Sequence, residues 1–448
     1  MSEGTSTTVT SGPRTASLLD TARVTAQVVL PTLAVGVIAR RPRMMAAAER
    51  IQADRKAVAV LQELRSRYGD GPLLLRVPGR TVAVVLAPEH VHRILSGSPE
   101  LFTPANREKQ TALGHFQPHG VLLSRGRERA QRREFHEEVL ETDRPVHDLG
   151  SRITSVVREE AQILLEETTK PATLDWSAFA HNWWRIVRRI VLGDRARHDQ
   201  ALTTQLDMLR SDANWAFLHP RRRSLRRHMR DRLAAHLQRR EPGTLAEQIA
   251  ASETSVTAPE EQVPHWLFAF DAAGMTAFRT LALLASHPQA AAAARQECAD
   301  LDLAEPHPLR YLRACVQESL RLWPTTPALL RDGVSATSWG SGSLPKGTAF
   351  VMYTPYFHRD ETTIDFAHTF TPDAWLDGRA EQQPALVPFS AGPGRCPGEN
   401  LVQFVTSTLL ACLLQGARFQ PSDPPEPDLR APLPATFDPF TARLRLSP

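Results

Sequence analysis

The spacing of hydrophobic residues predicts a chain that is mostly helical, with a few short strands. Residues 45–68 are strong helix formers, and residues 73–86 place two apolar runs around a Pro-Gly pair, which predicts a hairpin. From about residue 125 to 325, amphipathic or buried helical patterns follow one another. The remaining elements are strands around 344–353, an irregular segment over about 354–395 and an apolar helix over about 401–415.

The front of the chain has a different pattern. Residues 1–20 are expected to form a flexible tail, because the first 18 are rich in serine, threonine and glycine without periodicity. Residues 21–44 form an apolar segment whose run over 24–39 contains Pro31 and is shorter than the roughly 20 residues of a spanning helix. We therefore expect this segment to pack on the body or touch a membrane surface.

Composition narrows the classes of function. The 448 residues carry a formal charge of +4, and the basic excess is too diffuse to indicate a nucleic-acid partner. Four cysteines form no CxxC pair and no metal-finger spacing, which favours a reducing cytoplasm.

One cysteine lies in a segment suited to a metal-bound thiolate, PFSAGPGRCPGENL, residues 388–401. Gly392 lets the backbone turn tightly, and Cys396 comes just before a predicted helix, whose free amides favour a thiolate. Arg395 adds positive charge, and Phe389 could shield the sulfur. Taken alone, these features also fit a catalytic nucleophile or a buried thiol.

The segment resembles the haem-binding signature F-x-x-G-x-x-x-C-x-G of the cytochrome P450 family through Phe389, Gly392, Cys396 and Gly398. Glu318-Ser-Leu-Arg321 is similar to the family's ExxR motif, in which two charges on one helix face pair and bind backbone. The resemblance implies an α-rich triangular prism over residues 45–448, a single catalytic domain with haem b between two long helices. It also implies that Cys396 binds the iron.

Other positions match the family in part. Arg331 is similar to an arginine that holds a haem propionate, and Arg133 stands where a second one is expected, with Arg129 in place of its aromatic partner. Gly394 replaces a cation that commonly reaches a propionate, and we expect Arg395 to compensate.

The meander, the irregular segment before the cysteine loop, departs from the family at Ala374. This residue stands where a third member of the Glu-Arg-Arg network is usual, and His368 is the nearest hydrogen-bonding candidate.

The long helix LFAFDAAGMTAFRTLALLASHP resembles the family helix that crosses the haem and carries an acid followed by a threonine. Counting back from His287-Pro288 places Asp271 at the acid and Ala272 at the threonine, which weakens the family's usual proton relay. Thr276 is about 140° further round the helix than Asp271, so it is a poor substitute. A second alignment, on Ala273-Gly274, breaks the spacing to His287.

We therefore predict a bacterial-type, cytoplasmic haem-thiolate monooxygenase that oxidises a small apolar or aromatic specialised metabolite. Its expected partners are O2 and a ferredoxin with its NAD(P)H reductase. It is expected to be a monomer, without a membrane span and with peripheral membrane contact as an option. Six aromatic residues are candidates to line the substrate pocket, although core packing is an alternative for each of them: Phe102, Phe116, Trp215, Phe217, Phe268 and Phe270.

Two alternatives stay open. The replaced threonine favours an atypical reaction, such as oxidative coupling, peroxide-driven oxidation or nitrene-type transfer. The altered family positions also fit a haem-binding protein that is not an enzyme.

Overall fold

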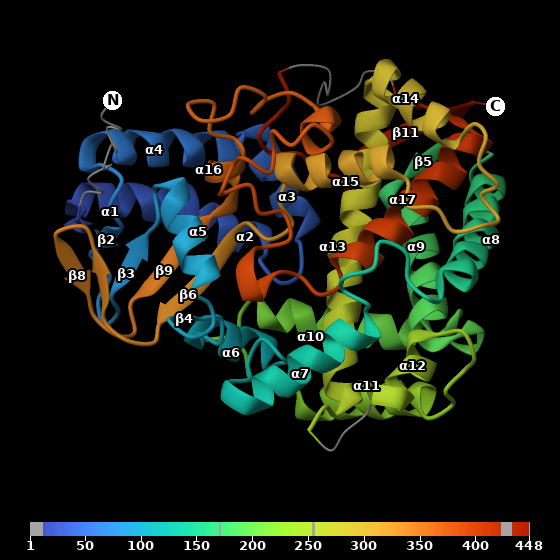
Figure 1. The fold of residues 1–448 in the computed structure, drawn as a ribbon, viewed down its shortest axis with the longest axis horizontal. Helices are drawn as coiled ribbons and strands as arrows, with labels where there is room; N and C mark the ends of the chain where they lie inside the picture. The colour runs from blue at the N-terminus through green and yellow to red at the C-terminus, as the bar shows by residue number, and fades with distance from the viewer. Residues whose placement is uncertain (1–11, 170–171, 253–255, 423–431, 448) are drawn as a thin grey trace, which may run out of the picture.

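The structure is a computed structural model, and it describes residues 12–169, 172–252, 256–422 and 432–447. Helices make up most of the molecule, and a mixed sheet lies at one side of it (Figure 1). The predicted class, mainly α with small β-sheets, is confirmed. Residues 1–11 of the predicted tail lie outside the described residues.

The helices of the first half of the chain are α1 (Leu18–Val24), η1 (Thr25–Val29), α2 (Leu30–Val35), α3 (Pro42–Arg50), α4 (Ala53–Tyr68), α5 (Pro88–Ser96), α6 (Arg107–Leu113), α7 (Gly126–Val139), α8 (Gly150–Thr168), α9 (Trp176–Leu192), η2 (Asp194–Ala196) and α10 (Gln200–Ala213). Those of the second half are α11 (Arg223–Leu237), α12 (Leu245–Ser252), α13 (Pro259–Ser286), α14 (Pro288–Cys298), α15 (Arg310–Leu322), α16 (Thr354–His358), η3 (Pro372–Trp375), η4 (Gly392–Gly394) and α17 (Glu399–Gly416).

The strands form three sheets. The largest has the order β1-β2-β3-β9-β6-β4, and β2 and β3 are antiparallel, as the hairpin pattern predicted. Its strands are β1 (Arg14–Thr15), β2 (Leu73–Leu75), β3 (Val82–Val84), β4 (Phe102–Thr103), β6 (Ala328–Gly333) and β9 (Ala349–Tyr353). The smaller sheets have the orders β10-β11-β5 and β7-β8. Their strands are β5 (Thr173–Asp175), β7 (Thr337–Trp339), β8 (Gly342–Leu344), β10 (Arg418–Pro421) and β11 (Arg443–Ser447).

The front segment is more ordered than the sequence predicted. Residues 12–20 were expected to belong to the tail, but β1 pairs in parallel with β2 and α1 begins at Leu18. The reason is Asp20, which is buried and accepts hydrogen bonds from the Tyr68 hydroxyl at 2.7 Å and from Arg67 at 2.9 Å. Pro31 does not end the helical path, because the π turn η1 precedes it and relaxes the backbone there.

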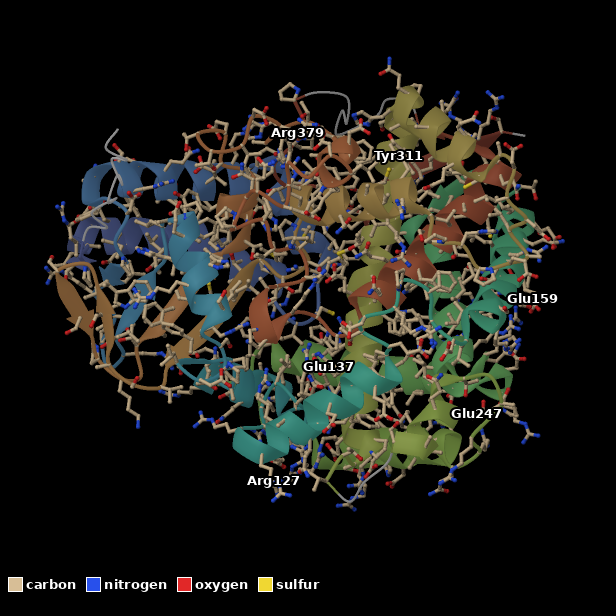
Figure 2. All side chains as sticks on the ribbon, in the orientation of Figure 1. Arg127, Glu137, Glu159, Glu247, Tyr311 and Arg379 are labelled. Atoms are coloured by element: carbon tan, nitrogen blue, oxygen red, sulfur yellow. The ribbon has the colours of Figure 1, made fainter. Side chains whose placement is uncertain are left out.

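Two long helices organise the larger core. α13 runs through the helical part of the molecule, and α17 crosses in front of it in Figure 1. Both contribute to one hydrophobic cluster with α8 and α9, whereas a second cluster lies between the large sheet and α4 and α5. Charged side chains such as Arg127, Glu159 and Glu247 lie at the periphery (Figure 2).

The predicted helix over 45–68 is broken into α3 and α4. Gln52 has a φ of +47°, and its side-chain amide donates to the Thr436 carbonyl at 3.1 Å and accepts from the Ala435 amide at 2.8 Å. This long-range anchoring offsets the cost of the left-handed residue.

Candidate active site

The cysteine loop connects η4 to α17 and has a fixed backbone. The Cys396 amide donates to the Phe389 carbonyl at 2.9 Å. Gly392 has a φ of +61°, and a Cβ there would lie 2.5 Å from the Leu95 carbonyl oxygen, so only glycine fits. Cys396 is half-buried, and burial raises the pKa of its thiol to about 11 although the Gly398 backbone opposes this. A bound metal ion would deprotonate this thiol outright.

Two arginines beside the loop are already engaged. Arg395 pairs with Glu399 at 2.6 Å, and its side chain is 62% exposed, so it does not compensate for Gly394 as we expected. Its guanidinium instead favours the carboxylate one helical turn away. Arg133 donates to the Arg395 carbonyl at 2.7 Å and pairs with Glu137 at 2.6 Å. Both arginines therefore support the loop from outside.

Three other cations, Lys109, Arg129 and Arg331, lie close together. The Lys109 Nζ and the Arg331 Nη1 donate to the same Leu330 carbonyl, at 3.4 and 3.0 Å, so the two charges lie close together. The buried Arg129 has an unpartnered Nε. No ion pair joins any of the three to a carboxylate in the part of the chain that the structure describes. Two of them were predicted from the sequence, and Lys109 was not.

The same cations have lowered pKa values. Burial lowers the pKa of Lys109 to about 7 and that of Arg331 to about 10, and the charges of neighbouring arginines add to both effects. Burial also lowers the pKa of Arg129. Gly394 makes room for this group, since a Cβ there would lie 3.0 Å from Arg331 Nη2. The arrangement is suited to binding an anionic group.

Glu318 and Arg321 form a fully buried pair on α15. Two hydrogen bonds of 2.7 and 2.8 Å join them, and Arg321 also donates to the carbonyls of four residues in and before the meander: His358, Phe366, Ala367 and Thr369. Every donor of this buried charge thus has a role in fixing the backbone that leads to the cysteine loop.

Two residues close to Ala374 in sequence, Thr371 and Trp375, donate hydrogen bonds to Glu318. Ala374 is buried and small, whereas the Trp375 indole donates to Glu318 at 2.9 Å and the Thr371 amide donates to it at 2.9 Å. His368 does not join the pair; it lies 3.2 Å from Arg359. Our suggestion of His368 was therefore wrong, because its ring faces another arginine.

The α13 residues predicted to be catalytic are tied to their neighbours. Asp271 pairs with the buried Arg210 of α10 at 2.5 Å. The buried Thr276 hydroxyl donates to the Ala272 carbonyl at 2.9 Å, which is a bond within the helix. Gly274 lies against Trp183 of α9, because a Cβ there would be 2.5 Å from that ring.

The position of Gly274 bears on the alignment. It faces α9, while Ala272 is half-buried on the same face as Phe268, four residues before it. This placement is consistent with the alignment that puts Asp271 and Ala272 at the family's acid and threonine. The catalytic roles of these residues stay predictions.

The six aromatic residues predicted to line a pocket separate into three groups. Phe116 and Phe268 meet edge to face, with ring centroids 5.8 Å apart. Phe102 packs on Phe350 in the sheet-side core, and Phe270 packs on Trp183. Trp215 and Phe217 are exposed, so they do not line an interior pocket. The structure therefore brings together two of the six.

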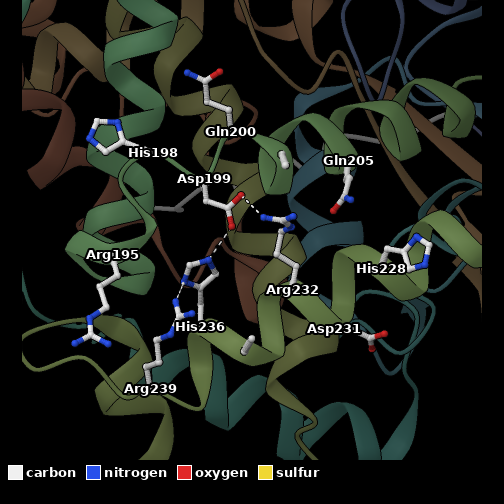
Figure 3. Close-up of a pocket in the computed structure, with 12 residues that line it drawn as sticks. Arg195, His198, Asp199, Gln200, Gln205, His228, Asp231, Arg232, His236 and Arg239 are labelled. Carbon is white, nitrogen blue, oxygen red and sulfur yellow. Dashed lines mark hydrogen bonds and ion pairs between the residues drawn. The ribbon is translucent and has the colours of Figure 1, made fainter.

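A large open groove lies elsewhere. It has a volume of about 890 Å³ and is lined by charged and histidine side chains between η2, α10 and α11 (Figure 3). Asp199 pairs there with Arg232 and His236, at 2.8 Å each. Its lining residues include none of the predicted site residues, so this groove is separate from the candidate site.

A family model described as cytochrome P450 matches residues 176–437, more than half of the chain. This chain belongs to the cytochrome P450 family. A probable cytochrome P450 4s3 of Drosophila melanogaster is 30% identical over 206 residues, which are 46% of this chain and 41% of that protein. The cyclooctat-9-en-7-ol 5-monooxygenase of Streptomyces melanosporofaciens is 30% identical over 115 residues, a quarter of each chain. The chain thus spans less than half the length of these curated relatives.

The fold of the P450 family extends over most of the chain. A crystal structure of a cytochrome P450 (CYP102L1) aligns with a TM-score of 0.69 and 20% identity, covering 87% of this chain and 98% of the other. At this identity the likeness concerns the fold, and it includes the long helices and small sheets described above.

The cofactor of the P450 family is haem b, and the residues present fit it. Haem b carries two carboxylates, and the unpaired cations Lys109, Arg129 and Arg331 match that charge. Cys396, in the family's loop, would hold its iron. Among the described residues, no three His, Cys, Asp or Glu side chains converge to hold a metal by themselves.

Proposed function

We propose that this P450 is a bacterial-type haem-thiolate monooxygenase that oxidises a small, mainly apolar specialised metabolite. It would use O2 and electrons from a ferredoxin with its NAD(P)H reductase. The observation that carries the proposal is the half-buried Cys396 in a fixed loop, with a group of three unpaired cations whose Arg331 lies against Gly394 of that loop. The Streptomyces relative, named a monooxygenase, supports the reaction class.

Each group has a defined task in this proposal. Haem b, when bound, supplies the oxidation chemistry. Cys396 would hold the iron, and Lys109, Arg129 and Arg331 would hold the carboxylates of the cofactor. Phe116 and Phe268 offer an apolar wall that excludes water from the reacting part of the substrate.

The proton path depends on Asp271. Its carboxylate is 23% exposed and pairs with Arg210, which holds it in one place. Ala272 has no hydroxyl, and the Thr276 hydroxyl is used within the helix. Protons would therefore pass through the Asp271 carboxylate, through water or through a hydroxyl of the substrate.

The same observations favour a second candidate function. A reaction that needs no threonine-assisted proton delivery would tolerate Ala272 and the engaged Thr276. Oxidative coupling, peroxide-driven oxidation and nitrene-type transfer are of this kind.

A paired turnover assay separates the candidates. The substrate is first found by a titration screen that follows haem absorption as candidate metabolites are added. Product is then measured with ferredoxin, reductase, NADPH and O2, with O2 excluded, and with hydrogen peroxide alone. A product that requires O2 and reduced ferredoxin supports the monooxygenase. Equal yield with hydrogen peroxide alone, or for nitrene-type transfer with O2 excluded, supports the second candidate. No product in any arm would support a haem-binding protein that is not an enzyme.

For localisation we propose a cytoplasmic protein with peripheral membrane contact. Two helices are long and apolar enough to be candidate spans, Leu18–Val35 and Pro259–Ser286, and the second is mostly buried. The first is largely exposed. The residues that follow it lie beside the end of α10, since the Asn214 side-chain amide accepts from the Ile38 amide at 2.9 Å and donates to the Ala39 carbonyl at 2.7 Å. Exposed apolar residues gather on these two segments: Leu30, Leu33, Trp215, Phe217 and Leu218.

Arginines accompany this apolar surface. Arg41 lies 4.5 Å over the Trp215 ring, and Arg107 lies 5.7 Å over the Phe217 ring. Apolar side chains beside cations favour an anionic lipid surface. The proposal predicts co-sedimentation with vesicles containing phosphatidylglycerol, weakened by Trp215→Ser with Leu218→Ser. Equal sedimentation of the double variant would contradict it.

A further inference from the structure

One face of α13 is less packed than the rest of the helix. Between Glu261 and Leu284 the half-buried residues are His265, Phe268, Ala269, Asp271 and Ala272, and all others are buried. Four of them lie at positions 265, 268, 269 and 272. Counted from His265 these are i, i+3, i+4 and i+7, a spacing that places all four on one face of the helix. This is the face that carries Ala272. His265 is its only titratable member.

The His265 ring is held in place from several sides. Its Nδ1 lies 3.0 Å from the Nε2 of Gln117, which is itself buried. Its edge meets the Phe268 ring at a centroid distance of 6.1 Å and the His136 ring at 6.3 Å. Burial lowers the pKa of His265 to about 4, with a smaller effect of Lys109, so the ring is neutral near pH 7.

The second nitrogen of the His265 ring, Nε2, is free to bind a further group. No described residue hydrogen-bonds the His265 Nε2. With Gln117 donating to Nδ1, the Nε2 carries the proton and is a donor; with the Gln117 amide turned over, the Nε2 is an acceptor. In both forms the Nε2 can make one hydrogen bond. A hydroxyl can donate and accept, so it can bind either form of the ring.

The side chains that follow His265 along this face of α13 are apolar. Phe268, Ala269 and Ala272 follow His265 along the face, and Phe116 packs against Phe268. Seven residues separate His265 from Ala272, which is about 10 Å along the helix axis at the usual rise. A hydrogen-bonding group therefore stands at one end of an apolar wall, well away from Ala272.

We propose that His265 is a specificity-determining residue that hydrogen-bonds, through Nε2, a hydroxyl or carbonyl group of the substrate, roughly 10 Å along the helix from the level of Ala272. The substrate class is then a mainly apolar molecule that carries one neutral polar group remote from the oxidised end. This inference rests on the proposed function, because it places the substrate along α13.

The test uses ligands that bind haem through an imidazole and extend a chain from it. A series of ω-(imidazol-1-yl)alkan-1-ols of increasing length is compared with 1-alkylimidazoles of equal length, by titration of the holoenzyme followed by haem absorption. At one chain length the hydroxyl should improve the affinity by about 5- to 10-fold, the gain from one hydrogen bond at a buried site. His265→Phe should abolish that gain, and His265→Asn should restore part of it.

The control variant is His228→Phe, on α11 in the separate groove, which should leave the gain unchanged. Unsubstituted imidazole should bind all variants equally, which shows that they fold and hold haem. A hydroxyl gain that persists in His265→Phe, or no gain at any length, overturns the inference while leaving the proposed function intact. If imidazoles shift the haem spectrum in none of the variants, the proposed function is contradicted, and this inference, which rests on it, fails as well.

Discussion

The cysteine loop with its supports and the stretch of α13 around Asp271 use charge in opposite ways. On the loop side, the ion pair of Glu318 and Arg321 is fully buried and every part of it bonds to backbone or to Trp375. On the α13 side, Asp271 is partly exposed and pairs with Arg210, an arginine from another helix. The first pair fixes a backbone, and the second links two helices, α10 and α13.

This difference indicates where the chain keeps the family pattern and where it departs from it. The loop presents one sulfur in one place, and beside Ala374 the Thr371 amide and the Trp375 indole both donate to Glu318. The α13 face fixes no backbone in this way, which fits our prediction that Ala272 stands where the family has a threonine.

The largest effect is expected from breaking the buried pair. Glu318→Gln leaves the Arg321 charge buried without its carboxylate, and we expect the free energy of unfolding to fall by about 3–5 kcal/mol. Urea unfolding followed by tryptophan fluorescence measures it.

The matched control is Asp377→Asn, which removes an exposed partner of Arg379 at the edge of the molecule (Figure 2). Exposed pairs contribute about 0–1 kcal/mol, so this variant should unfold close to the wild type. A similar loss in both variants would show that the buried pair is not the special support we describe.

Next in size is the effect of Asp271→Asn on turnover. The amide cannot hold or pass the proton and leaves Arg210 buried without its partner, so turnover with ferredoxin should fall on the order of 100-fold. Product formed per NADPH consumed should fall with it.

Asp207→Asn controls for the effect on Arg210 alone. Asp207 lies 4.0 Å from the same arginine, but it is exposed and belongs to α10. We expect its turnover and coupling to stay near the wild type. Unchanged turnover in Asp271→Asn would remove the carboxylate from the proton path.

The smallest effect is expected from Thr276→Val. The substitution removes a hydrogen bond within the helix, which should cost about 0.5–1.5 kcal/mol of stability and change turnover less than about 3-fold. Thr280→Val is the matched control, because the Thr280 hydroxyl makes the same type of bond to the Thr276 carbonyl at 2.8 Å. A much larger loss of turnover in Thr276→Val than in Thr280→Val would place this hydroxyl in the proton path and favour the second alignment.

The sequence predicted the elements whose signals are local. The glycines around Cys396, the spacing of Glu318 and Arg321, and the apolar periodicity of α13 and α17 each follow from a few neighbouring residues, and the fold class they indicated is confirmed. The hairpin of β2 and β3 was also visible, because its two apolar runs flank a turn.

What the sequence missed depends on contacts between distant segments. Gln52 breaks a helix only because residues 435 and 436 offer it backbone partners. Lys109 joins Arg331 at the Leu330 carbonyl across more than 200 residues, and Arg210 reaches Asp271 from another helix. No local pattern marks these residues, and the exposure of Trp215 and Phe217 likewise depends on how α2 and α10 are placed.

The central claim, that Cys396 holds a haem iron as a thiolate, is tested most directly by the absorption spectrum of the reduced holoprotein with carbon monoxide. The account predicts the red-shifted band of a thiolate-ligated haem in the wild type and the band of a histidine-ligated haem in Cys396→His. A wild-type spectrum of the histidine type, unchanged in the variant, would contradict the account.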